Sequence, residues 1–225
     1  MDNYFSRRKS ISRHISVSLV CAVTGLLSAI QVSADDNVIK KQGAWLVGLK
    51  VLTLGPSERS VTSVGGEAKV SSDTVPELDI RYFLTDNIAL ETILGYTKHE
   101  VSAVETEYGD VNLGSTKVLP PTLSLQYHFN RGLGFSPYVG AGINYTFFFD
   151  HDPGDALDIS YEDGFGFALN AGFDYVFSER HYLNVDIKKY TLSTEVSIDA
   201  GLEQLVDASV DLDPLAISVG YGWIF

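Results

Sequence analysis

Hydrophobic and polar residues alternate with a period of two along most of the chain, from about residue 44 to the last residue. This alternation is typical of β-strands with one apolar face, and the segments are rich in the aromatic and β-branched residues that strands favour. We therefore predict eight strands. They are Ala44 to Leu54, Val75 to Leu84, Ile88 to His99, Leu119 to Phe129, Pro137 to Phe149, Phe165 to Phe177, Tyr182 to Thr194 and Val210 to Phe225.

The connections between these strands alternate in length. Four are long (Gly55 to Thr74, Glu100 to Val118, Asp150 to Gly164, Glu195 to Ser209) and three are short (Thr85 to Asn87, Asn130 to Ser136, Ser178 to His181). Short turns at one end and long loops at the other are typical of outer-membrane barrels whose termini both lie in the periplasm. We predict an all-β fold, an eight-stranded antiparallel up-and-down transmembrane β-barrel with short periplasmic turns and long extracellular loops.

One face of several strands is almost uninterruptedly apolar. In the sixth strand this face carries Phe165, Phe167, Leu169, Ala171, Phe173 and Tyr175. Faces of this kind suit lipid better than water. A soluble β-sandwich would also alternate, but it would not require the loop asymmetry, a secretory leader and an aromatic final residue together.

The opposite faces, which point into the barrel, divide by depth. Toward the short turns and the middle lies a charged lumen floor of Lys50, Glu77, Asp79, Arg81, Glu91, His128, Asp174, Asp186 and Lys188. Toward the long loops lies an apolar lumen pocket of Leu52, Leu54, Ile93, Thr122, Phe148, Ala168 and Leu192. Charges of both signs in so narrow a barrel are expected to pair and close it. The upper residues predict a pocket open to the outside, or alternatively a small core that simply fills the upper barrel.

Two consecutive prolines, Pro120 and Pro121, interrupt the fourth strand at its loop end. Neither can donate a ladder hydrogen bond, so both weaken pairing with the neighbouring strands. Strand parity places Pro120 inward and Pro121 toward lipid. Because a lipid-exposed gap in a barrel wall is costly unless protein or a cavity backs it, we interpret this pair as a lateral gate.

The N-terminus predicts a cleaved secretory signal peptide over residues 1–34, followed by the barrel over residues 35–225. Four basic residues precede an apolar run that ends at Val32-Ser33-Ala34. The only cysteine, Cys21, lies within this leader, so the remaining chain has neither disulfides nor thiol chemistry. That chain carries 12 basic and 28 acidic side chains, a balance that excludes nucleic acid as a partner.

The chain ends on Ser218, Gly220, Trp223 and Phe225, a pattern with an aromatic terminal residue that is typical of the signal read by the outer-membrane assembly machinery. Four segments then carry a resemblance to a known family. They are Thr85 to Ile88 with Glu91, Gly114 to Thr122, Pro137 to Tyr145, and Asp213 to Gly222, including the specific runs LPPT and PYVGAGINY. The chain resembles the OmpW family of outer-membrane proteins over essentially all of its length after the leader.

This resemblance implies an eight-stranded barrel with a hydrophobic channel that helps small apolar molecules across the outer membrane, some relatives being linked to alkane uptake. We expect passive uptake through the apolar upper lumen with lateral release into the bilayer. The expected partners are outer-membrane lipid, lipopolysaccharide, the assembly machinery and small apolar solutes. The alternative is a structural or adhesin-like barrel whose extracellular loops bind a partner or lipopolysaccharide.

The remaining polar clusters predict no cofactor, no metal site and no enzyme. The third and fourth long loops are acidic, but the spacing DHDPGD lacks the ordered ligand pattern of a calcium loop, so we interpret both as solvated acidic loops. A nucleophile with its base would require His128 close to Ser124. The two residues are four positions apart on one strand, which separates them by about 13 Å. We therefore expect no catalytic residue.

Overall fold

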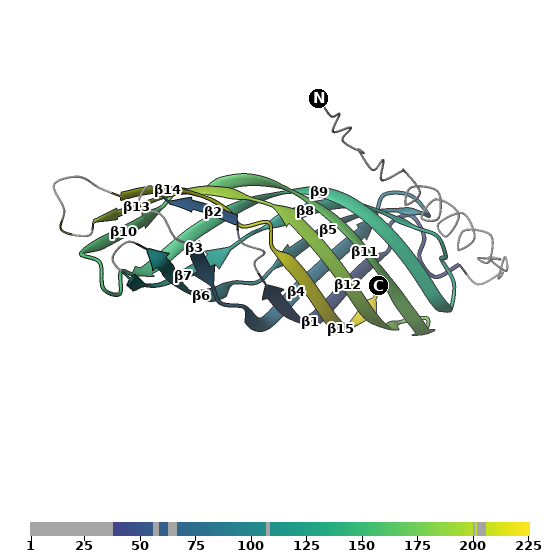
Figure 1. Ribbon diagram of the computed structural model, residues 1–225. Helices are drawn as coiled ribbons and strands as arrows, with labels where there is room; N and C mark the ends of the chain where they lie inside the picture. The colour runs from purple at the N-terminus through teal and green to yellow at the C-terminus, as the bar shows by residue number, and fades with distance from the viewer. Residues whose placement is uncertain (1–37, 56–58, 63–66, 107–108, 200, 202–205) are drawn as a thin grey trace, which may run out of the picture. The chain divides into compact units, whose positions relative to one another are not determined.

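Eight antiparallel strands close into a barrel in the computed structural model, which describes residues 38–55, 59–62, 67–106, 109–199, 201 and 206–225. They are β1 (Trp45–Gly55), β4 (Asp73–Phe83), β5 (Ile88–Leu94), β8 (Thr122–His128), β9 (Gly134–Asp152), β11 (Gly164–Ser178), β12 (His181–Thr191) and β15 (Leu215–Ile224). They pair in the order β1-β4-β5-β8-β9-β11-β12-β15, and β15 pairs with β1 to close the ring (Figure 1). The predicted eight-stranded barrel is therefore confirmed, whereas the predicted signal peptide lies outside the described residues.

The segments predicted as long loops contain further strands, and the structure corrects the strand bounds accordingly. These strands are β2 (Arg59–Thr62), β3 (Glu67–Val70), β6 (Thr97–Thr106), β7 (Gly109–Leu119), β10 (Asp158–Tyr161), β13 (Ser193–Asp199) and β14 (Val206–Asp211). β2, β10, β13 and β14 form a four-stranded sheet at the loop end, while β3, β6 and β7 continue from β9 (Figure 1). Paired strands thus extend into segments that were predicted as long connections.

Several predicted strands are two strands separated by a short break. The fourth predicted strand contains the boundary between β7 and β8 at Pro120-Pro121, and the eighth contains the boundary between β14 and β15 before Pro214. Proline lacks the N–H that a ladder requires, so these breaks have a direct chemical cause. The third predicted strand breaks at Gly95-Tyr96, where the ladder between β4 and β5 also ends.

Large apolar side chains cover the outside of the barrel. Phe165, Phe167 and Leu169 of β11 are exposed, as are Leu123 and Leu125 of β8. Their inward neighbours along each strand are buried, in the alternation that the sequence predicts. Among the described residues, no helix is long and apolar enough to cross a membrane.

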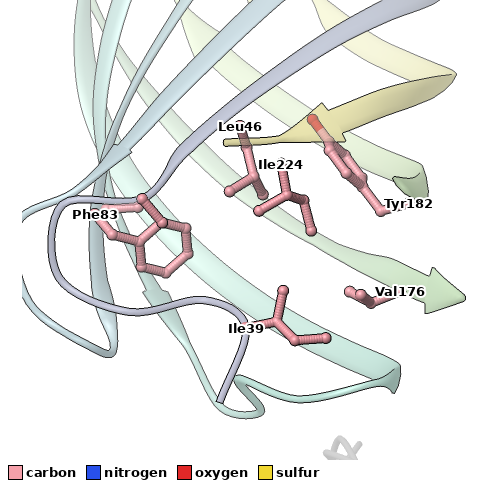
Figure 2. Packing of buried hydrophobic residues seen from close by; sticks show 8 residues of the cluster. Ile39, Leu46, Phe83, Val176, Tyr182 and Ile224 are labelled. Carbon is pink, nitrogen blue, oxygen red and sulfur yellow. The ribbon is translucent and has the colours of Figure 1, made fainter. Parts of the chain in front are cut away.

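A cluster of apolar side chains closes the end of the barrel that carries the short turns (Figure 2). Ile39 belongs to the segment Val38–Ala44 that precedes β1, and it packs with Leu46, Phe83, Val176 and Ile224 from four different strands. Backbone hydrogen bonds hold this segment in place, since the amides of residues 39 and 40 both donate to the carbonyl oxygen of residue 131. We call this cluster the basal plug.

Candidate functional site

The charged floor is joined across the barrel by two ion-pair braces. Arg81 of β4 donates two hydrogen bonds from one guanidinium nitrogen to both carboxylate oxygens of Asp174 of β11, at 3.1 and 3.0 Å. Lys188 of β12 lies 2.6 Å from the carboxylate of Glu91 of β5. In a ring of eight strands, β4 lies opposite β11 and β5 lies opposite β12, so each brace spans the lumen.

Further polar contacts connect to the residues of these two braces. Lys50 lies 2.7 Å from Asp79 and 3.7 Å from Glu77, and the Nε atom of Arg81 lies 3.2 Å from Asp79. Asp186 lies 3.8 Å from Lys188 and accepts hydrogen bonds from neutral side chains of β9 and β11. None of the nine predicted floor residues is more than 4% exposed, so these charged side chains are packed against one another and almost entirely removed from solvent.

Lys40 is a floor residue that the sequence prediction missed. Its ammonium group lies 2.5 Å from Asp174 and donates to the hydroxyl of Ser136, and it lies 3.3 Å from Nδ1 of His128. Lys40 lies in the segment before β1. Because this segment has no strand periodicity, its sequence pattern does not show which side chains point into the lumen. A lysine close to the first strand, next to the apolar Ile39, was the available signal.

Neutral hydrogen-bonding side chains connect the floor charges, and sequence analysis had not assigned most of them a role. Tyr138 donates to Asp186 at 2.8 Å, and Asn184 donates to both Asp174 and the Tyr138 hydroxyl. Nε2 of His128 lies 3.1 Å from Oε1 of the Gln126 side chain. The predicted floor is thus one continuous network rather than a set of separate pairs.

Below this network lies the basal plug, which corrects the prediction that the turn end of the lumen is charged. The plug residues face inward at the strand ends nearest the turns, and Phe83 and Tyr182 are fully buried there. Apolar residues occupy this level because the chain folds back underneath the barrel and excludes water from it. The lumen therefore has three levels: an apolar plug, a charged floor and an apolar upper part.

The upper lumen residues gather in two clusters of buried side chains. Leu52, Leu54 and Ala168 pack with Tyr190 and Ala216 in one cluster. Phe148 and Leu192 pack with Val118 in the other. These side chains contact one another within each cluster, so a solute entering the upper lumen would have to part them.

Ile93 and Thr122 belong to neither cluster and pair with each other between β5 and β8, directly beside the proline break. Thr122 donates a hydrogen bond to the carbonyl oxygen of Pro120 at 2.9 Å, and its hydroxyl lies 3.4 Å from that of Tyr190. The structure thus places the two remaining predicted pocket residues at the predicted gate.

The two prolines remove backbone hydrogen-bond donors from the barrel wall without changing the register of the strands. On the β9 side, Thr122 pairs with Asn144 and Leu119 pairs with Phe147, a step of three residues on both strands. On the other side, Ile93 pairs with Thr122 and Thr97 pairs with Val118, a step of four residues on both. The break consists of missing backbone donors and not of a bulge.

Each proline removes a donor toward a different neighbour. The amide of Tyr145 donates to the carbonyl oxygen of Pro121 at 3.2 Å, which shows that residue 121 faces β9. Alternate residues of an antiparallel strand face opposite neighbours, so Pro120 faces the β5–β6 side. The wall is therefore weakened on both sides of the same strand position.

The four C-terminal residues of the predicted assembly signal divide between the two faces of β15. Ser218 is buried on the inner face, and Gly220 lies against the backbone of Lys50, where a Cβ atom would come within 2.6 Å of Lys50 Cα. Trp223 and Phe225 are exposed on the outer face, Phe225 at 75%. The backbone of Phe225 exchanges two hydrogen bonds with Trp45, which closes the barrel at its first and last strands.

The acidic loop residues of the third loop are used to hold backbone and surface groups. Asp150 lies 2.5 Å from Lys117, and this hydrogen-bonded contact raises the pKa of Lys117 and lowers that of Asp150. Asp155 and Asp163 accept hydrogen bonds from the backbone amides of residues 112 and 148. Within the described part of the chain, no group of three or more histidine, cysteine or acidic side chains is arranged to hold a metal ion.

Comparisons with known proteins agree with this architecture. The OmpW family model matches residues 42–225. The uncharacterized outer-membrane protein y4mB of Sinorhizobium fredii is 37% identical over 209 residues, which cover 91% of this chain and 90% of that one. The dibenzothiophene metabolism operon protein PahQ of Pseudomonas aeruginosa is 28% identical over 159 residues, covering 70% of this chain and 74% of that one. The crystal structure of the outer membrane protein OprG from Pseudomonas aeruginosa superposes with a TM-score of 0.78 at 29% identity, covering 84% of this chain and 99% of that one.

Proposed function

The chain belongs to the OmpW family of bacterial outer-membrane barrels, a non-enzymatic family, and from this premise we propose that it takes up small hydrophobic molecules passively. In this proposal a solute enters between the strands of the loop end and parts the two apolar clusters of the upper lumen. It then leaves sideways into the lipid at Pro120 and Pro121. The name of the relative PahQ, which refers to the apolar compound dibenzothiophene, supports the same class of solute.

The buried ionic network of the floor is the observation that carries this proposal. An apolar solute in the upper lumen meets the ionic network next, and moving it through would require breaking ion pairs that are out of water. The wall beside Thr122 lacks two backbone donors at the same depth. A sideways path therefore disrupts fewer interactions than a path through the floor.

The test replaces both prolines with residues that can pair, as Pro120→Val with Pro121→Val. The register is continuous across the break, and Tyr145 already donates to the carbonyl oxygen of residue 121, so an amide at position 121 faces an existing partner on β9. We therefore expect slower uptake of an apolar solute such as n-octane into cells. The matched control is Pro137→Val at the turn end of β9, which should leave uptake unchanged. Folding is checked by the heat-dependent mobility of the barrel in gel electrophoresis.

An unchanged uptake rate in the folded double variant would exclude the lateral gate. The adhesin-like alternative makes a different prediction, since exchanging the loop-end strands would abolish its phenotype while Ala168→Phe in the upper cluster would have no effect. Uptake that responds to Ala168→Phe therefore favours transport. We also propose that the C-terminal pattern is read by the outer-membrane assembly machinery. The loops are proposed to contact lipopolysaccharide and so to anchor the barrel.

A further inference from the structure

Four neutral polar side chains lie on one wall of the lumen between the charged floor and the apolar upper clusters. They are Ser124 and Gln126 of β8, Asn144 of β9 and Asn170 of β11. All four are at most 6% exposed. We call them the amide patch.

Strand register brings these side chains into adjoining rows. Gly140 of β9 pairs with Gln126 on one side and with Asn170 on the other, so the two amides flank one glycine. The adjoining row pairs Ser124 with Gly142, and the row after that contains Asn144. The patch is therefore one contiguous area across three strands.

Each member of the patch keeps one polar atom without a hydrogen-bond partner among the described residues. These atoms are Ser124 Oγ, Gln126 Nε2, Asn144 Oδ1 and Asn170 Oδ1. The other polar atom of each amide already has a partner. Asn144 donates to Thr146, Asn170 donates to Asp186, and the side-chain oxygen of Gln126 contacts His128. The carboxylate of Asp186 accepts only, so it fixes the free end of Asn170 as the oxygen. The four free atoms, as placed, are one amide donor, two amide acceptors and a hydroxyl that can do both.

Glycines make room for three of these free oxygens. A Cβ atom on Gly142 would lie 2.5 Å from Ser124 Oγ, and one on Gly166 would lie 2.4 Å from Asn144 Oδ1. A Cβ atom on Gly140 would lie 2.3 Å from Asn170 Oδ1. At Gly142 and Gly166 a Cβ atom would also meet a backbone carbonyl oxygen, at 2.3 and 2.2 Å, so the polar oxygens lie where the strands already pack closely.

An unpaired buried donor or acceptor costs roughly 1–3 kcal/mol, so four on one wall call for a binding partner. Sites for apolar ligands commonly combine an apolar body with a few polar groups that fix orientation. The four patch side chains are uncharged, and the charged groups beside them, Glu91 and Asp186, already contact Lys188. A charged ligand group would therefore be desolvated there without a free counter-charge. A hydroxyl group, which both donates and accepts, matches the free atoms best.

We propose that the amide patch binds the neutral polar head of an amphiphilic solute, such as an alcohol, while its apolar tail lies against the upper clusters. The inference rests on the proposed uptake function and names its substrate class. Thr122 lies one step from Ser124 along β8 and contacts Pro120, so a head bound at the patch leaves the tail beside the gate. Solutes with a single neutral head are therefore favoured over plain alkanes.

The test follows the side-chain amide NMR signals of ¹⁵N-labelled protein in lipid nanodiscs during titration with 1-octanol or n-octane at equal membrane concentration. The signals of Gln126, Asn144 and Asn170 are assigned by their loss in single variants. We expect 1-octanol to shift these signals and n-octane to leave them in place. Shifts that are equal for both solutes, or absent for both, would overturn the proposal, the latter meaning that water satisfies the free atoms.

Two variants measure the contribution of the patch. Ser124→Ala, which removes a hydroxyl without a described partner, should weaken octanol binding roughly three- to tenfold, as should Asn144→Leu. The matched control is Ser115→Ala, another buried serine, which lies in β7 on the loop side of the prolines and should leave binding unchanged. If Asn144→Leu does not fold, the octanol affinity of Ser124→Ala alone tests the head-group site.

Binding and uptake fail separately in these experiments. Octanol binding that is unaffected by Ser124→Ala would refute the head-group site while leaving uptake of apolar solutes untouched. Unchanged octane uptake in the proline variants, together with specific octanol binding, would instead refute the lateral route and leave the site in place.

Discussion

The carboxylate of Asp174 contacts more groups than any other charge of the described floor. Neutralising it should therefore lower the free energy of unfolding more than any other single change there. Its carboxylate accepts hydrogen bonds from Arg81, Lys40 and Asn184. Asp174→Asn keeps the size of the side chain but leaves two buried cations facing a neutral group. Removing one partner of a buried ion pair typically costs about 3–5 kcal/mol. We expect about 3 kcal/mol, since Arg81 retains its contact of 3.2 Å with Asp79.

Urea-induced unfolding of the barrel in lipid vesicles, followed by tryptophan fluorescence, measures this loss. A double-mutant cycle with Lys40→Met isolates the contribution of the N-terminal segment, and we expect the second substitution to recover part of the loss because it removes one of the stranded cations. The control is Asp86→Asn, whose partner Arg131 lies at the surface and whose effect should be under about 1 kcal/mol. A loss below about 1 kcal/mol for Asp174→Asn would refute the view that the floor is a single coupled network.

Three further changes test other levels of the molecule. Phe83→Ala in the basal plug removes a fully buried ring and should lower the free energy of unfolding by about 3–5 kcal/mol in the same urea assay, a smaller loss meaning that the plug collapses around the gap. Gly114→Ala should disrupt the pairing of β7 with β9, because Gly114 has a φ of 76° and a Cβ atom there would come within 1.8 Å of the Asp152 carbonyl oxygen. Amide hydrogen exchange in β7 should become faster, and unchanged exchange would contradict this prediction. Burial lowers the pKa of His99 below its ordinary 6.5, so the unfolded chain takes up the proton more readily, and stability that is full above pH 6.5 should fall as the pH drops below it. The difference in urea midpoint between pH 7.5 and 5.5 should shrink in His99→Asn, and an equal difference in both proteins would refute this assignment.

The period of two and the lengths of the connections were enough to predict the barrel, because both are local properties of the chain. They assigned Arg81, Asp174, Glu91 and Lys188 to the inner face without indicating which groups meet. Arg81 and Asp174 are 93 positions apart, and only the order of closure places their strands opposite each other. Pairing across a lumen is a property of the closed ring and not of any one strand.

Lys40 and the basal plug could not be predicted by the same reasoning, because the segment before β1 has no periodicity that assigns its side chains to a face. The strand breaks were also only partly predictable. Proline explains the boundaries at Pro120 and Pro214 chemically, whereas the break at Gly95 coincides with the end of the ladder to β4 and depends on how the two strands diverge. The segments predicted as long connections instead continue as paired strands beyond the barrel.

The distribution of charge around the ring supports the position proposed for the lateral exit. The two braces join β4 with β11 and β5 with β12, and Lys50 of β1 adds a contact to β4. By contrast, the described inward side chains of β8 and β9 carry no carboxylate or ammonium group, and the seam between these strands is held by backbone bonds and neutral contacts. The missing donor of Pro121 falls on this same seam. Separating β8 from β9 near Thr122 therefore breaks no ion pair, whereas an opening between β4 and β1 would separate Lys50 from Asp79. His128 and Tyr138 tie the turn ends of β8 and β9 to the floor through Lys40 and Asp186, but no ion-pair brace joins these two strands near Thr122. A local opening there would therefore leave the ionic floor intact.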